Sequence, residues 1–258
     1  MQKIALCFLT YENLSQPKLW SKIINNNKDK LNVYIHNKKD FIDKEYNLHQ
    51  YCIQNRIETS YANKSLVEAT LTLFKEAYKN ITNCFFILLS DKCIPLYNFE
   101  YIYKEIFSSN SNIISSIPTS SIPFGHFTNR MRYLQLTDPT FLDKKKTVKD
   151  SQWLSLNRTT VNFFIENNFL NMYSNNFYAA DEHYFGNICI KFDIPYLNRK
   201  ITFVNWEQKS DNKNDRQYPK TYEKITHQMV EQIMDNNVFF LRKVSSNCIL
   251  PPYFDTLS

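Results

Sequence analysis

The sequence predicts an α/β protein in which a mixed sheet is flanked by helices. Short β-rich runs alternate with helix-compatible segments over the first half of the chain, which is the rhythm of βαβ units. A continuous apolar run, "CFFILLS" at 84–90, then follows the clearest amphipathic helix. The 258 residues are 43% hydrophobic and show no internal repeat or composition break. We therefore expect a single domain over residues 1–258 with one large core.

The first βαβ unit is predicted from two β-rich runs, "KIALCFLT" at 3–10 and "NVYIHN" at 32–37. The polar stretch between them contains the helix-compatible segment "PKLWSKIINN" at 17–26. We expect the two runs to form neighbouring parallel strands, because a crossover helix joins strands in that way.

A helix is predicted at 65–80, "SLVEATLTLFKEAYKN", because apolar residues recur on one helical face. Ser65 and Glu68 have the spacing of a capping box at its start. The apolar run 84–90 is too short for an independent helix and suits a central strand that is buried on both faces. We expect Pro95 to halt that strand.

The remaining elements follow from the same patterns. We expect helices at 99–107, 151–168, 181–191 and 226–236, and strands at 112–118, 201–206 and 238–244. Residues 118–149 lose all periodicity, and a long irregular segment inside a compact domain is often functional. The polar stretch 208–220 is predicted to be a mobile loop.

The motif content excludes several classes of site. The chain contains two glycines, Gly125 and Gly186, with which neither GxGxxG nor GxxxxGK[ST] can be written. HExxH, GxSxG and Cys/His clusters at zinc spacing do not occur in the sequence either. Dinucleotide-fingerprint, P-loop, zincin and nucleophile-elbow sites are therefore excluded.

The formal charge of +6 arises from 31 basic and 25 acidic residues, an excess that suits an anionic ligand. The densest basic run, "DKKKTVK" at 143–149, is predicted to be a solvated loop. Nucleic-acid-binding proteins usually concentrate their positive charge more strongly. We therefore expect no nucleic-acid partner.

The six cysteines form no CxxC pair, and some lie in apolar runs where a reduced thiol behaves as a small hydrophobe. No run approaches the roughly 18 apolar residues that a membrane span needs. The start, "MQKIALCFLTYEN", lacks the features of a signal peptide. We expect a soluble, cytoplasmic protein without a membrane span.

Polar residues at element ends are the candidate functional groups. Acids at 181 and 182, followed by a histidine, precede an amphipathic segment, and from the residues alone helix capping is the favoured interpretation of Asp181 and Glu182. His183 is more often structural in such a position. Residues 90–91 and 36–37 end two predicted strands, where α/β sheets open their ligand crevice. Binding and a simple turn are equal alternatives there.

Six stretches occur in one order along the chain: "SLVEATLTLFKEA", "FFILLSDKCIPLYNFEYIY", "DSQWLSLNR", "DEHYF", "ITFVNWEQ" and "FFLRKV". In this order and spacing they resemble the core-2/I-branching glycosyltransferases, most closely the plant branch of that family, which is related to peptide O-xylosyltransferases. The similarity spans roughly residues 65–243 and is weaker over the first sixty.

The resemblance implies a glycosyltransferase-A type fold and inverting transfer from a UDP-sugar without a metal ion. By position, Glu182 matches the family's catalytic base, and Lys243 matches a basic residue that contacts the donor's diphosphate. Arg242, Lys220 and Arg216 are further candidates for this contact. No Asp-x-Asp motif, the usual metal-binding signature of this fold, occurs in the sequence. We therefore expect no divalent metal and no other cofactor beside the UDP-sugar.

The remaining candidates are divided between the two substrates. His36, Asn37, Ser90 and Asp91 are predicted to bind the donor. Trp153 and Asp181 are predicted to bind the acceptor. Trp153 either stacks on a sugar face or fills the core, with equal weight. Asp181 is also expected to cap the helix that follows it. We expect residues 1–115 to bind mainly the nucleotide-sugar, and residues 116–258 to supply mainly acceptor binding and catalysis.

Two departures from the family pattern affect the donor. Asn37 stands where many relatives have an acid, and "YANKS" at 61–65 lacks their Trp-Gly. The expected function is transfer of N-acetylglucosamine or xylose to a glycan or glycosylated acceptor in the cytosol. The alternatives are a non-catalytic binder of anionic polymers, which would use the basic excess and 17 tyrosines, and a glycan-binding relative without turnover.

Overall fold

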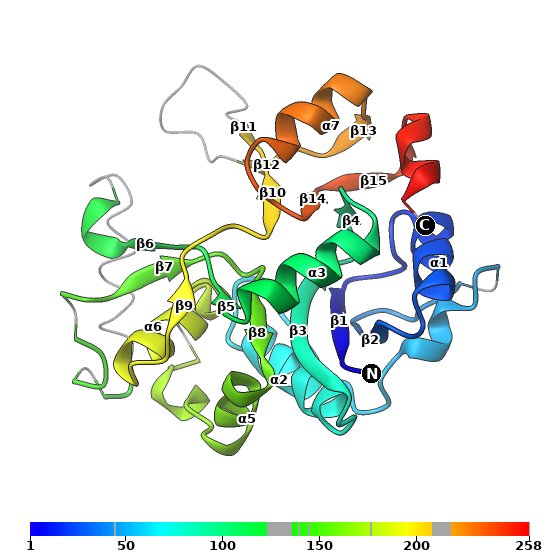
Figure 1. Ribbon diagram of the computed structural model, residues 1–258. Coiled ribbons are helices and arrows are strands. Elements are labelled where there is room, and N and C mark those ends of the chain that lie inside the picture. Colours follow the sequence, from blue (N-terminus) through cyan, green and yellow to red (C-terminus); the bar gives the residue numbers. More distant parts are fainter. Residues whose placement is uncertain are drawn as a thin grey trace.

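The computed structural model describes residues 1–43, 45–122, 136–138, 140–143, 145–175, 177–207 and 218–257. Arg216, Gly125 and most of the polar stretch 208–220 lie outside the described residues. A six-stranded sheet forms the centre of the molecule (Figure 1). In spatial order its strands are β2 (Leu31–Asn37), β1 (Lys3–Thr10), β3 (Asn83–Ser90), β8 (Ser155–Asn157), β5 (Asn112–Ile113) and β9 (Tyr196–Leu197).

The sheet is largely parallel, as the sequence predicts. β1 pairs in parallel with β2 and β3, and β5 pairs in parallel with β9, whereas β8 runs antiparallel to both β3 and β5. The predicted central strand is confirmed, because the side chains of β3 from Phe85 to Ser90 are all buried. A strand that is covered on both faces needs such a continuous apolar run.

Helices cover both faces of the sheet. They are α1 (Pro17–Asn26), α2 (Ser65–Tyr78), α3 (Phe99–Ser109), α5 (Arg158–Glu166) and α6 (Phe185–Lys191). A further helix, α7 (His227–Met234), lies away from this sheet (Figure 1). Neighbouring residues of a strand point to opposite faces. The ring of Phe85 lies 5.0 Å from that of Phe107 in α3, and the ring of Phe86 lies 6.1 Å from that of Phe74 in α2. α3 and α2 therefore pack on opposite sides of β3.

The predicted helix at 65–80 is confirmed as α2, but its predicted capping box is wrong. Ser65 is the first residue inside the helix, and its hydroxyl accepts the N–H of Ser60 at 3.0 Å. The side chain of Asn63 accepts the N–H of Ser65, also at 3.0 Å. The turn that leads into α2 thus uses the oxygens of Ser65 and Asn63, and the N-cap residue, Lys64, makes no side-chain cap bond.

The prediction of a helix over 151–168 is wrong in its first part. Ser155–Asn157 forms β8 and α5 begins at Arg158, where the Asn157 side chain caps the helix by accepting the N–H of Thr160 at 2.9 Å. Trp153 consequently lies in the segment that enters β8. Pairing on both sides, with β3 and with β5, outweighs the helical pattern of this stretch.

A second, three-stranded sheet consists of β10 (Thr202–Val204), β14 (Phe240–Arg242) and β4 (Ile94–Pro95). β3 already ends at Ser90, and Pro95 lies in the edge strand β4, so Pro95 does not halt β3 as predicted. Smaller pairs are β6 (Ser116–Pro118) with β7 (Val148–Asp150), β11 (Trp206–Glu207) with β12 (Tyr218–Pro219), and β13 (Tyr222–Lys224) with β15 (Val244–Ile249).

Short 3-10 helices complete the described structure: η1 (Leu48–Tyr51), η2 (Thr119–Ser121), η5 (Leu170–Met172), η6 (Ala180–Glu182) and η7 (Pro252–Thr256). One continuous cluster of buried apolar side chains runs from Ile4 to Leu257. All six cysteines are free thiols. No helix in the described part of the chain is long and apolar enough to cross a membrane.

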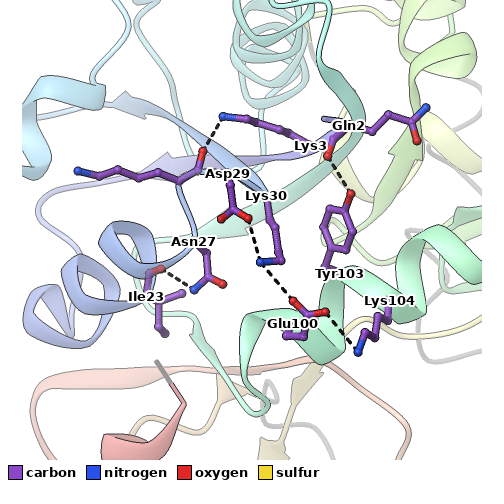
Figure 2. A network of polar contacts seen from close by, with 10 residues as sticks. Gln2, Lys3, Ile23, Asn27, Asp29, Lys30, Glu100, Tyr103 and Lys104 are labelled. Carbon is purple, nitrogen blue, oxygen red and sulfur yellow. Dashed lines mark hydrogen bonds and ion pairs between the residues drawn. The ribbon is translucent and has the colours of Figure 1, made fainter.

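A polar network joins α3 to the amino-terminal end of the sheet (Figure 2). The Lys30 ammonium lies 3.0 Å from Asp29 and 3.3 Å from Glu100, and Glu100 in turn lies 3.3 Å from Lys104. The Tyr103 hydroxyl donates to the carbonyl of Gln2 at 2.9 Å. These contacts fix the start of α3 beside the amino-terminal ends of β1 and β2. They do not involve the carboxyl ends of these strands.

A buried carboxylate from a distant strand caps α6. Asp150, the last residue of β7, accepts the N–H of Gly186 at 2.7 Å. The prediction that Asp181 caps this helix is wrong, because Asp181 and Glu182 lie in η6 and α6 begins at Phe185. A Cβ atom on Gly186 would lie 2.2 Å from the Asp150 carboxylate, so the close approach requires glycine.

We predict that Gly186→Ala lowers the free energy of unfolding by about 1–3 kcal/mol, because the methyl group displaces the Asp150 carboxylate. In an Asp150→Ala background the same substitution should instead be neutral or stabilise by about 0.5–1 kcal/mol, since alanine has the higher helix propensity. Urea unfolding of the four proteins measures both effects. Equal destabilisation in the two backgrounds would contradict the assigned clash.

Candidate functional site

The carboxyl ends of β1, β2 and β3 meet at one edge of the central sheet, at Thr10, Asn37 and Ser90. In Figure 1 this edge points away from the amino terminus and toward β14 and β15. Open α/β sheets bind their ligands outside the carboxyl ends of their strands. The sequence-predicted residues at the ends of β2 and β3 therefore lie on the expected edge.

Ser90 is the centre of a tight turn after β3. Its hydroxyl oxygen accepts the N–H of Lys92 at 3.1 Å and the Nε–H of Arg242 at 3.0 Å. The carbonyl of Asp91 accepts the N–H of Ser15 at 2.8 Å, which ties the turn to the loop that follows β1. Burial raises the pKa of the Asp91 carboxyl, and the charges of Lys92 and Arg242 oppose this shift.

Arg242, the last residue of β14, lies over the ring of Trp153, with 4.7 Å between its central carbon and the ring centroid. Trp153 is 6% exposed, so Arg242 covers an otherwise buried indole. Burial lowers the pKa of Arg242, and the nearby carboxylates of Asp91 and Asp181 counteract this shift. Beyond the bond from Nε to Ser90, its guanidinium donates no hydrogen bond to the described residues.

Lys243 and Lys220 adjoin Arg242. The N–H of Lys243 donates to the carbonyl of Lys220 at 3.3 Å, and the carbonyl of Lys243 accepts the N–H of Tyr222 at 2.8 Å. The ammonium of Lys220 lies 5.5 Å from the ring centroid of Tyr222. Burial, followed by the charge of Arg242, lowers the pKa of Lys243. Three of the four predicted cations are thus brought together, and Arg216 lies outside the described residues.

Glu182 forms an ion pair that the sequence did not reveal. Its Oε2 lies 3.2 Å from Nζ of Lys149, and the two side chains are 29% and 32% exposed. Lys149 belongs to β7, so the predicted solvated loop at 143–149 is wrong at this end. Lys149 is half-exposed between buried Val148 and buried Asp150, but the sequence Val-Lys-Asp has no apolar alternation that could have revealed this strand.

Two further acids lie beside Glu182. Burial raises the pKa of Asp150 well above its ordinary value, and the negative charge of Glu182 adds to this shift, whereas the hydrogen bond from Gly186 opposes it. Asp181 is buried, and its charge acts on Arg242. The charge of Asp181 therefore links η6 electrostatically to Arg242 at the end of β14.

The histidines and Asn37 are held by the surrounding chain. His36 is fully buried and its Nε2 accepts the N–H of Ile57 at 3.1 Å, while burial lowers its pKa. His183 is fully buried with Nδ1 3.2 Å from the carbonyl of Val148, in keeping with a structural role. The Nδ2 of Asn37 donates to the carbonyl of Lys39 at 2.6 Å.

Asn37 also lines a cavity of about 460 Å³ beyond the end of β2, together with Asp40, His49 and Arg56. Its Oδ1 is buried without a hydrogen-bond partner among the described residues. A donor-binding role of Asn37 has a suitable space beside it. His36 is not among the residues that line this cavity.

The arrangement pairs a cationic group with a carboxylate at one edge of the sheet. Arg242 and Lys243 can attract an anionic ligand, and Glu182 can accept a proton from a hydroxyl brought next to it. No group of three histidine, cysteine or acidic side chains with the geometry of a metal site occurs in the described ranges.

Comparison with known proteins gives two matches. A family described as "Core-2/I-Branching enzyme" matches residues 4–236. A protein of Oryza sativa subsp. japonica named "Glycosyltransferase BC10" is 25% identical over 170 residues, which cover 64% of this chain. The aligned part amounts to 40% of the rice protein's length.

We predict that Asp150 makes the stability of the protein depend on pH. Because its folded-state pKa is raised, the folded protein retains a proton that the unfolded chain loses above about pH 4. The contribution of Asp150 to stability therefore falls as the pH rises through this window, by at most about 1.4 kcal/mol per pH unit. The unfolding free energy of Asp150→Asn minus that of the wild type should accordingly increase between pH 4.5 and 7.5.

Urea unfolding at one-unit pH intervals checks this expectation. The exposed Asp193 provides a matched control, because Asn also adopts its left-handed backbone, and Asp193→Asn should follow the wild type in parallel. Parallel curves for Asp150→Asn and the wild type would show that Asp150 is ionised in the folded protein.

Proposed function

This chain belongs to the Core-2/I-Branching enzyme family, and on that premise we propose that it is an inverting, metal-independent glycosyltransferase. It would transfer a sugar from a UDP-sugar to a glycan or glycosylated acceptor. The fold agrees with this family, since a parallel-rich sheet flanked by helices is of the glycosyltransferase-A type. The observation that supports the proposal most is the family match over residues 4–236, which include Glu182.

Glu182 is proposed as the general base. As an acceptor hydroxyl attacks the anomeric carbon, a C–O bond forms on one face of the sugar, and the bond to the diphosphate breaks on the other face. The hydroxyl proton passes to the Glu182 carboxylate, and the bonding electrons leave with UDP. The ion pair with Lys149 in β7 holds the Glu182 carboxylate in place for this step.

Arg242 and Lys243 are proposed to bind the diphosphate. Negative charge accumulates on its oxygens as the sugar leaves, and fixed cations in a partly buried site stabilise that charge without reorganisation. Ser90 and Trp153 hold the Arg242 guanidinium in place before any donor arrives. Lys220 adjoins this pair, and its contact with the donor is part of the proposal.

The donor would be UDP-N-acetylglucosamine or UDP-xylose, with Asn37 and the cavity beside it near the nucleotide. We further propose a reducing, cytosolic setting, for which the six free thiols provide support. The acceptor would be met there.

We predict that Glu182→Gln lowers the rate of transfer about 10²–10⁴-fold with the fold intact, because the amide keeps the shape and cannot take the proton. Release of UDP from UDP-N-acetylglucosamine and UDP-xylose, with a panel of glycoside acceptors, measures the rate. Glu166→Gln, an exposed site on α5, is the matched control and should behave as the wild type. Retention of more than about a tenth of the wild-type rate would place the base elsewhere.

The same panel tests the non-catalytic alternatives. A protein that binds oligonucleotides with steep salt dependence and releases no UDP from either donor would be a polymer-binding protein. Binding of glycosides without any UDP release would instead indicate a glycan-binding relative without turnover.

We predict that turnover is unchanged in excess EDTA and that Lys243→Ala lowers it about 10²-fold or more, because cationic side chains take the place of a metal at the diphosphate. Lys104→Ala on the exposed surface of α3 is the matched control. Parallel assays with EDTA, Mg²⁺ and Mn²⁺ measure the effect. Loss of wild-type activity in EDTA, with recovery on addition of Mn²⁺, would overturn the metal-independent mechanism.

A further inference from the structure

Two tyrosines lie beside Glu182 without a role in the mechanism above. Tyr61, in the loop before α2, is 90% exposed, and Tyr178, just before η6, is 46% exposed. The two hydroxyl groups act on each other electrostatically. Large aromatic side chains that remain this open to solvent, next to a candidate catalytic carboxylate, are suited to contact a ligand.

The loop before α2 is fastened to the segment before η6. Three hydrogen bonds join them: Ala179 N–H to the carbonyl of Ala62 at 2.7 Å, Asn63 Nδ2 to the carbonyl of Asn175 at 3.2 Å, and Lys64 Nζ to the carbonyl of Tyr173 at 3.2 Å. These segments are more than a hundred positions apart in the chain. The proximity of Tyr61 to Glu182 is therefore built by specific contacts.

Each tyrosine precedes a residue with left-handed backbone. Ala62 has φ 53° and Ala179 has φ 56°, a conformation that is unfavourable for alanine. Such strain persists only where surrounding contacts hold it, and here the two strained residues hydrogen-bond to each other. The backbone thus places both tyrosines where the loop before α2 meets the segment before η6.

The segment around Tyr178 is held by the buried side chains of its neighbours. The ring of its neighbour Phe177 is buried against His183, and the hydroxyl of buried Tyr173 donates to the carbonyl of His183 at 3.0 Å. Tyr178 is the aromatic residue of this segment that faces solvent. The buried contacts of Phe177 and Tyr173 hold the described residues on either side of η6 against the core.

Backbone hydrogen bonds place Tyr61 close to η6. The carbonyl of Ala62 accepts the N–H of Ala179 at 2.7 Å, and the carbonyl of Ala179 accepts the N–H of Glu182 at 3.0 Å. The side chain of Tyr61 remains open to solvent. Tyr61 consequently presents an aromatic face to solvent near the candidate base.

We propose that Tyr61 and Tyr178 form the acceptor-binding platform of this protein, on which a pyranoside ring stacks with one of its hydroxyls directed at Glu182. The assignment of the bound sugar as acceptor rests on the proposed function. A pyranose has an apolar face of C–H groups and a polar rim of hydroxyls, which matches the apolar face and polar edge of a tyrosine. Stacking on this platform would leave the rim hydroxyls within reach of the η6 carboxylates.

Saturation-transfer NMR with the whole protein tests the platform directly. The probes are the methyl β-glycosides of galactose, glucose, N-acetylglucosamine and xylose, each with and without UDP. We expect saturation of the ring C–H protons of at least one glycoside. Its dissociation constant should rise about two- to tenfold in Tyr61→Ala and in Tyr178→Ala, and at least as much in the double variant.

Tyr61→Phe and Tyr101→Ala are the controls. Tyr61→Phe keeps the ring and should retain most of the affinity. If the hydroxyl group of Tyr61 had a merely structural role, Tyr61→Phe would bind the glycoside as weakly as Tyr61→Ala. Tyr101 is 39% exposed on α3 and belongs to a separate tyrosine pair, so Tyr101→Ala should bind as the wild type. No saturation of any probe, or equal affinity in the double alanine variant and the wild type, would overturn the proposal.

A turnover measurement separates this proposal from the proposed function. In the double alanine variant, with UDP-N-acetylglucosamine or UDP-xylose as donor, KM for the glycoside should rise with kcat nearly unchanged. Saturation transfer requires no turnover, so the platform can bind sugar even if Glu182→Gln leaves transfer intact. Conversely, normal transfer by the double variant would refute the platform and leave the proposed enzyme in place.

Discussion

A half-buried cation at the carboxyl edge of the sheet, Arg242, links segments that are far apart in the chain. Arg242 donates to Ser90 at the end of β3 and covers Trp153 at the entry to β8, so β14 is fixed against the central sheet. Taking a guanidinium out of water is costly unless polar groups and π faces replace the lost hydration. Ser90, Trp153 and the carboxylates of Asp91 and Asp181 supply this replacement, and the position of the whole site depends on it.

The parts of the fold that the sequence predicted are those in which a local pattern decides the structure. The apolar run of β3 and the amphipathic face of α2 are examples, because burial on two faces or on one stripe leaves a clear period. β8 could not be predicted, since three residues carry no readable period and its partners lie more than 40 positions away. Its segment therefore resembled the start of the following helix.

The candidate site shows the same division. The position of Glu182 came from a resemblance to other proteins, whereas its neighbours Lys149 and Asp150 were missed because they arrive from another strand. From the sequence, the acids at 181–182 were expected to cap the helix that follows them. The carboxylate that caps α6 is instead that of Asp150, 36 positions before Gly186. A helix start exposes several unpaired N–H groups, and any acceptor that reaches them can serve.

The scarcity of glycine has a consequence for ligand binding. Six residues other than glycine adopt left-handed backbone in the described chain, namely Asn47, Ala62, Asn110, Ala179, Asp193 and Asn237. Compared with glycine, a residue with a side chain at such a position has fewer backbone conformations, both in the unfolded chain and in the loop. Less conformational entropy is therefore lost when the loop becomes ordered. Where the loop before α2 meets the segment before η6, ordering before a ligand arrives makes association entropically easier. The same stiffness narrows the range of ligand shapes that the two loops can accommodate.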